Sequence, residues 1–120
     1  MSHIVTIQTK LRDPMAVTMA CRRLGLADPV QGSVRLFSAE AAGLIVCLPD
    51  WRYPVVVDPS SGDVRYDNFE GQWGDSRQLH RLIQAYAAEK TKLEARKKGW
   101  AVQESTLHDG SIQLHLTRPS

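Results

Sequence analysis

The fold of this chain is decided by residues 44–66, which read LIVCLPDWRYPVVVDPSSGDVRY. The run Leu44–Leu48 is continuously apolar and ends at a proline, as is typical of a strand that is buried on both faces. After it, two short apolar segments, Val55–Val57 and Val64–Tyr66, flank the stretch Asp58–Asp63. That stretch is dense in Asp, Pro, Ser and Gly, which favour turns, so the pattern predicts a β-hairpin.

Towards the N-terminus, the pattern predicts a strand, a short helix and a second strand. Polar and apolar residues alternate over His3–Lys10, which indicates the first strand. Asp13 is a preferred N-cap residue and Pro14 suits the first helical position, so the helix is expected to begin there and to stop at Gly25. The second strand is predicted over Val34–Phe37.

Towards the C-terminus, the pattern predicts the longest helix of the chain. Asp75 or Ser76 caps it, it runs to about Lys98, and Gly99 ends it. Trp100 is then placed to fold back on the last helical turn. The apolar stripe of this helix consists of Leu79, Leu82, Ile83, Tyr86 and Leu93, with the stem of Lys90 filling a gap.

The last twenty residues predict a second hairpin. Ala101–Leu107 and Ile112–Arg118 flank a tight turn at Asp109-Gly110, a favoured turn pair. Ile112, Leu114 and Leu116 are expected to point inward. The order of the predicted elements indicates an α+β fold, with a single, mostly antiparallel β-sheet and two helices packed on one face.

Length and composition set the class of protein. A chain of 120 residues has room for a single domain, residues 1–120, with one hydrophobic core. With 42% hydrophobic and 23% charged residues, it is neither a disordered chain nor a disulfide scaffold. No segment is apolar enough for a signal peptide or a membrane span, and Cys21 and Cys47 read as small buried residues. We therefore expect a cytoplasmic protein that does not bind membranes.

Positive charge is concentrated at the end of the second predicted helix. Residues 76–120 carry eight Lys and Arg against four Asp and Glu, whereas residues 1–75 carry seven against nine. The candidate nucleic-acid-binding residues are Lys92, Arg96, Lys97 and Lys98, which would contact phosphates. The alternative is structural, because cations at a helix C-terminus complement the helix dipole.

Large aromatic residues occur in or near the predicted loops. Trp51, Tyr53 and Phe69 are the candidate partner-binding residues, because exposed Trp and Tyr side chains dominate protein interfaces. If they are buried, they instead close the edge of the core. Trp73, at the entry to the long helix, is assigned to the core.

Signatures of catalysis are absent from the sequence. It contains no nucleophile elbow, no zinc-protease helix, no Cys-x-x-Cys pair and no phosphate-binding loop, and we expect no cofactor. His3, at the start of the first strand, is a candidate acid–base group or ligand. His108 and His115, on the terminal hairpin, are a candidate metal site.

Several short motifs resemble one known family. It is the conserved plastid and cyanobacterial reading-frame family numbered 35, also called domain-of-unknown-function family 1257. The motifs are Met1-Ser2-His3, Thr6-Ile7-Gln8-Thr9-Lys10, Arg12-Asp13, Trp73-Gly74, Gln84-Ala85-Tyr86-Ala87, Ala95-Arg96 and Asp109-Gly110-Ser111-Ile112 with Leu114. Residues 51–58 depart from the family pattern. The resemblance implies a small bacterial, phage or plastid protein that is encoded near other small proteins and sometimes near AAA-type ATPases, and it implies no reaction.

The leading hypothesis from the sequence is a non-catalytic accessory protein that docks on a larger partner. An AAA-type ATPase or a neighbouring small protein is the partner that the family resemblance implies. A free sheet edge would serve either a partner strand or a homo-oligomer. Two alternatives stay open: a nucleic-acid-binding protein that uses the basic helix end, and a small-molecule or metal-dependent enzyme.

Overall fold

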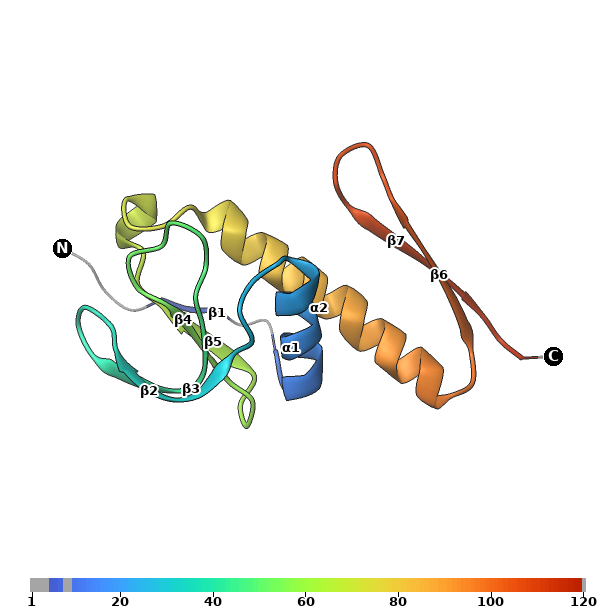
Figure 1. Cartoon of the computed structure of the whole chain (residues 1–120), viewed down its shortest axis with the longest axis horizontal. Coiled ribbons are helices and arrows are strands. Elements are labelled where there is room, and N and C mark those ends of the chain that lie inside the picture. The colour runs from blue at the N-terminus through green and yellow to red at the C-terminus, as the bar shows by residue number, and fades with distance from the viewer. Residues whose placement is uncertain (1–4, 8–9, 120) are drawn as a thin grey trace.

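The chain folds into two β-sheets joined by a long helix (Figure 1). The computed structural model describes the backbone of residues 5–7 and the whole of residues 10–119. Its elements are β1 (Val5–Ile7), α1 (Pro14–Arg23), β2 (Val30–Arg35), β3 (Glu40–Val46), β4 (Val55–Asp58), β5 (Asp63–Tyr66), the 3-10 turn η1 (Phe69–Gly71), α2 (Ser76–Lys97), β6 (Ala101–Thr106) and β7 (Ile112–Thr117). The predicted α+β class and the antiparallel pairing are both confirmed.

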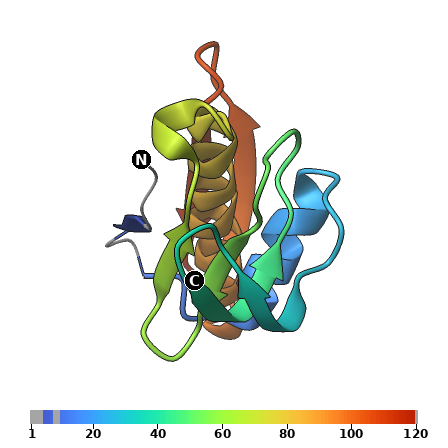
Figure 2. The same cartoon turned by 90° about the vertical axis from the view of Figure 1, so that its left-hand side faces the viewer.

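The larger sheet has five antiparallel strands in the order β1-β5-β4-β3-β2, and both helices cover the same face of it. Figure 2 looks onto the strands with α2 running away behind them. The covered face presents Leu44 and Val46 from β3 and Val55 and Val57 from β4, all buried against α1 and α2. Val56 alternates with its neighbours and points to the opposite face.

Asp13 joins the start of α1 to the middle of α2. Its side chain caps α1 by accepting hydrogen bonds from the amides of Met15 and Ala16, as predicted. The same carboxylate accepts from Lys90 Nζ at 3.0 Å, and the Asp13 amide donates to the Tyr86 hydroxyl at 3.2 Å. The hydrogen bond from Lys90 is the main reason that the pKa of Asp13 lies below its usual value.

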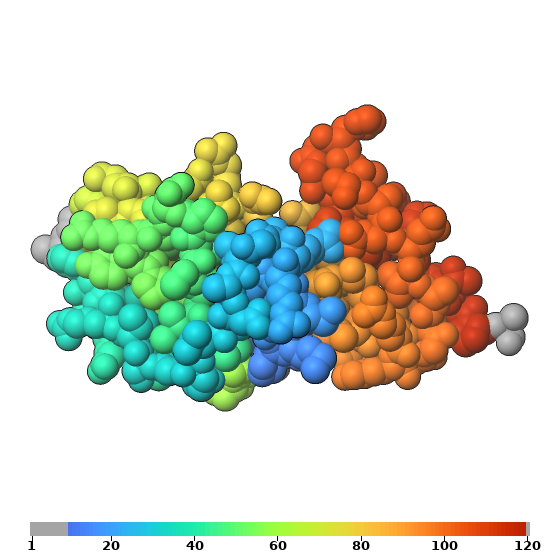
Figure 3. Space-filling view, in the orientation of Figure 1, coloured from blue at the N-terminus to red at the C-terminus, as the bar shows by residue number. Residues whose placement is uncertain are grey.

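The terminal hairpin does not join the larger sheet. β6 and β7 form a two-stranded sheet of their own, which packs on the C-terminal half of α2 and gives the molecule its long dimension of 56 Å (Figures 1 and 3). Val102, Ile112 and Leu114 on its helix-facing side are half-buried, whereas the residues on its outer side are exposed. The single sheet expected from the sequence is thus a five-stranded sheet with a separate hairpin.

An ion-pair network ties this hairpin to both helices. Arg23 of α1 donates two hydrogen bonds of 2.7 Å to the carboxylate of Glu104 in β6. Lys92 of α2 lies 3.2 Å from Glu104 and 2.7 Å from the buried Glu89. The hydrogen bonds from Arg23, followed by those from Lys92, lower the pKa of Glu104 to about 2. Glu104 is therefore the link between the hairpin and the body of the protein.

We predict that Glu104→Gln destabilises the protein at pH 7 by about 1 to 2 kcal/mol, allowing for solvent screening of a partly exposed pair. Because the pKa of Glu104 is lower in the folded chain, its charge stabilises the fold fully above about pH 4.5. This contribution is lost as the pH falls towards 2. Urea unfolding from pH 7 to pH 2.5 should show the wild type and the variant converging.

The matched control is Asp28→Asn, which removes a similar charge from the exposed pair between Asp28 and Arg22. This variant should change stability little at any of these pH values. If Glu104→Gln destabilised the protein as much at pH 2.5 as at pH 7, packing of the side chain and not its charge would account for its contribution.

Two details differ from the sequence-based expectations. β2 begins at Val30 and β3 at Glu40, each four residues before the predicted start, so the β2–β3 hairpin is longer than expected. Cys47 is exposed, which corrects its assignment as a buried residue, and both cysteines are free thiols. Cys47 follows the last residue of β3, where the alternation of buried and exposed positions turns it outward.

The helices of the described chain include none that is both long and apolar enough to cross a membrane.

Candidate protein-binding site

Four aromatic side chains from turns and loops around the larger sheet meet and form what we call the aromatic cluster: Phe37, Tyr53, Phe69 and Trp73. Trp73 is at its centre. Its ring centroid lies 4.8 Å from that of Phe69, 5.2 Å from Phe37 and 5.7 Å from Tyr53. The four residues come from four separate segments: the β2–β3 turn, the β3–β4 loop, η1 and the loop before α2. Phe37 is 49% exposed, so the cluster reaches the protein surface.

Arg52 completes the surface of the cluster. Its guanidinium carbon lies 4.7 Å from the ring centroid of Trp73 and 5.7 Å from that of Tyr53. Arg52 is exposed, and within the described residues it forms no ion pair with a carboxylate. The aromatic rings therefore hold a cation in place while leaving its charge available to a ligand.

Backbone hydrogen bonds lock the two loops of the cluster together. The amide of Arg52 donates to the carbonyl of Trp73 at 2.8 Å, and the amide of Trp73 donates to the carbonyl of Asn68 at 2.9 Å. The buried side chain of Asn68 in turn donates to the carbonyl of Gly74 at 3.2 Å. Arg52 and Trp73 are thus held on a connected backbone frame.

The same two loops contain unfavourable backbone and side-chain features. Asp50, Phe69 and Glu70 have φ angles of 61°, 47° and 54°, and they are the only non-glycine residues of the described chain in the left-handed region. Asp67 is fully buried, and its carboxylate oxygens accept no hydrogen bond from the described residues. Such features reduce stability, and they concentrate where function maintains them.

The cluster continues onto the sheet face that the helices leave uncovered. A small second core of Leu36, Ala41 and Val56 lies on this face, and Val34, Ile45 and Tyr53 pack against it while remaining partly accessible. Tyr53 therefore belongs both to this second core and to the aromatic cluster. Tyr53 thus connects the aromatic cluster to this second core, whose Leu36, Ala41 and Val56 are themselves buried.

Trp51 lies apart from the cluster. It packs against the main core, with its ring centroid 5.7 Å from that of Tyr66, and its Nε1 donates to the carbonyl of Asp75 at 3.1 Å. A Cβ atom on Gly74 would overlap the Trp51 ring. Of the predicted partner-binding residues, the structure therefore brings together Tyr53 and Phe69 but not Trp51.

We predict that Gly74→Ala destabilises the protein by about 2 to 4 kcal/mol, because the added methyl group must displace the Trp51 indole from the core. The φ angle of Gly74 is not in the left-handed region, so the effect is one of space alone. The loss of stability is measured by thermal unfolding, with circular dichroism as the probe.

Gly32→Ala in β2 is the matched control, since its Cβ would meet only Ile45 at an ordinary 3.6 Å. We expect this second variant to stay within about 1 kcal/mol of the wild type. Equal melting temperatures for Gly74→Ala and the wild type would show that Trp51 is not packed as described.

The predicted nucleic-acid-binding residues divide into two groups. Lys92 is only 18% exposed and pairs with Glu89 and Glu104, and Lys97 pairs with Glu94 at 3.3 Å. Arg96 and Lys98 are exposed, and neither forms an ion pair with a described carboxylate. Two of the four residues thus stabilise the fold and two present free charge.

The histidines do not meet in a site that the structure describes. His108 lies in the tight turn of the hairpin, and His115 lies on the outer side of β7 opposite Gln103, both exposed. His3 lies outside the described residues. Within residues 10–119, no three His, Cys, Asp or Glu side chains are grouped so that they could hold a metal ion. Burial raises the pKa of Cys21 to about 11, which keeps its thiol protonated and unreactive.

Comparison of the chain with protein-family models, with curated proteins and with solved structures finds no match. The resemblance to family 1257 therefore stays a prediction. Three residues of the site, Phe37, Arg52 and Trp73, were not among the predicted binding residues. The only sequence signal for them was their position in or beside loops that also carry other aromatic residues.

Proposed function

We propose that this protein is a non-catalytic protein-interaction module that docks a partner through the aromatic cluster and Arg52. The observation that carries the proposal is the convergence of four aromatic side chains from four segments on one accessible site. The main core lies on the other side of the sheet and contains none of the four.

The exposure and charge of the site support a docking role. Aromatic residues and arginines contribute most of the binding free energy in protein interfaces, particularly where they are held rigidly before binding. Trp73 is held by backbone hydrogen bonds on both its amide and its carbonyl, and Arg52 is stacked on its ring. Little side-chain entropy remains to be lost when a partner binds.

The chemistry of the site also supports one kind of partner. Arg52 is a free cation beside apolar rings. Arg65, on the strand next to Val56, is a second exposed arginine, and it forms no ion pair within the described chain. A protein segment with an aromatic or aliphatic side chain next to a carboxylate matches this arrangement. The partner is therefore an acidic, apolar protein segment.

We predict that Phe37→Ala and Arg52→Glu each weaken binding of the partner by about thirtyfold, as expected for hot-spot residues. Both side chains are exposed, so the fold should be preserved. The tagged protein is used to capture partners from its host with and without nuclease, and the affinity of the recovered partner is then measured for each variant.

Arg81→Glu, an equal change of charge at an exposed position of α2, is the matched control and should bind like the wild type. A partner that binds Arg52→Glu and Phe37→Ala as tightly as the wild type would contradict the assignment of the surface. Loss of every partner on nuclease treatment would contradict the proposed function itself.

A further inference from the structure

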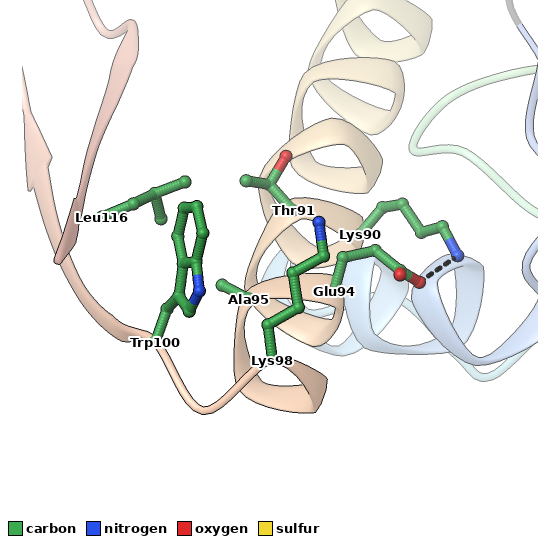
Figure 4. A pocket seen from close by; sticks show the side chains of 7 residues that line it. All are labelled: Lys90, Thr91, Glu94, Ala95, Lys98, Trp100 and Leu116. Atoms are coloured by element: carbon green, nitrogen blue, oxygen red, sulfur yellow. Dashed lines mark hydrogen bonds and ion pairs between the residues drawn. The ribbon is translucent and has the colours of Figure 1, made fainter. Parts of the chain in front are cut away.

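A groove lies at the opposite end of the molecule, between the last turns of α2 and strand β7 (Figure 4). It has a volume of about 250 Å³ and is mostly apolar, with Trp100 and Leu116 on one side and the helix on the other. Leu116 is 42% exposed although it points towards the helix. The groove therefore leaves apolar surface open to a ligand.

Trp100 is fixed in position as one wall of this groove. Its amide donates to the carbonyl of Ala95 at 2.9 Å, which closes the C-terminus of α2 after Gly99, as the sequence predicted. Its side chain lies beside Ala95 and Leu116 in Figure 4. A half-buried tryptophan held in this way is a rigid, flat binding surface.

Free positive charges surround the Trp100 ring. Arg118 Cζ lies 5.2 Å and Lys98 Nζ 5.6 Å from the ring centroid, whereas Arg96 does not line the groove. Within the described residues, neither Arg118 nor Lys98 pairs with a carboxylate. The other two lysines of this helix end, Lys90 and Lys97, are both bound to Glu94, at 2.9 and 3.3 Å.

We propose that this groove binds single-stranded nucleic acid, with a base stacked on Trp100 and the phosphates contacted by Lys98 and Arg118. An aromatic ring flanked by cations that lack carboxylate partners matches a ligand that is flat, apolar on its face and negatively charged along its length. A duplex offers phosphates but no free base face, so it would use the charges without the tryptophan. The remaining polar side chains of the groove are Thr91 and the ion pair of Lys90 with Glu94, and stacking on an aromatic ring tolerates any base, so we expect little dependence on sequence.

The site differs from the one that the basic sequence pattern indicated. Lys92 and Lys97 are not part of this site, because carboxylates of the fold already bind them. Trp100 and Arg118 belong to it, because the hairpin returns beside the end of α2. The site is also independent of the proposed protein-interaction surface, which lies at the other end of the molecule.

The test is fluorescence anisotropy with a labelled ten-nucleotide oligo-dT and the full chain at 50 to 200 mM salt. Two phosphate contacts predict a slope of log affinity against log salt of about −1.4, so the affinity should fall about sevenfold over this range. A duplex of the same length should bind at least tenfold more weakly at 50 mM salt. Failure to bind oligo-dT at 50 mM salt, or a preference for the duplex, would overturn the proposal.

Variants separate the charges from the stacking. Lys98→Gln and Arg118→Gln should each reduce the magnitude of the salt slope by about 0.7, whereas Arg22→Gln, which removes an exposed arginine from α1, should leave it unchanged. Trp100→Ala should weaken binding about tenfold and Trp100→Phe should restore most of it. If circular dichroism shows that Trp100→Ala does not fold, the stacking is tested by fluorescence instead. Oligo-dT should then quench the tryptophan fluorescence of the wild type, and this quenching should be lost in Trp100→Phe.

Two outcomes would overturn the proposed site: unchanged binding by both glutamine variants, or an equal loss of binding in Arg22→Gln. Either would show that the nucleic acid is attracted only by the overall charge of the protein. None of these variants touches the aromatic cluster. Capture of the protein partner should therefore be the same in all of them, and the outcome at one end of the molecule does not depend on the outcome at the other.

Discussion

The structure depends on one constraint: α2 is longer than the sheet it covers. Its 22 residues span about 33 Å, whereas the strands it crosses contain four to seven residues each. Its first half is buried on the sheet through Leu79, Leu82 and Tyr86. Its second half would expose Ala88 and Ala95 if the hairpin did not cover them. The small second sheet is therefore the cover that the length of the helix requires.

Features that are encoded locally were predictable from the sequence. The caps at Asp13 and Asp75, the helix stop at Gly99 and the Asp-Gly turn of the last hairpin all depend on residues within a few positions of one another. Pairing over longer distances was not predictable in this way. Nothing local shows that β1 pairs with β5 or that the last hairpin leaves the main sheet, because both depend on contacts between residues that are far apart in the sequence.

The candidate sites show the same limit at the level of single side chains. Trp51 and Tyr53 are two residues apart in one loop and look alike in the sequence, yet Trp51 packs against the main core and Tyr53 against the small second core. Lys92 and Lys98 belong to one basic run, yet Glu104 of the hairpin binds only the first. Whether an aromatic or a charged residue is free to bind a ligand depends on neighbours that are distant in sequence. The composition of a segment therefore identifies candidate binding residues, but it does not separate them from residues that stabilise the fold.

The separation of the two surfaces by α2 has a consequence for any assembly that the protein joins. A continuous helix is stiff over this length, so it acts as a rigid spacer and not as a flexible tether. A protein segment held at the aromatic cluster and a nucleic-acid strand held at Trp100 would not compete for space. The two ligands would instead be held at a fixed separation, and any direct contact between them would gain from the high effective concentration that this separation imposes.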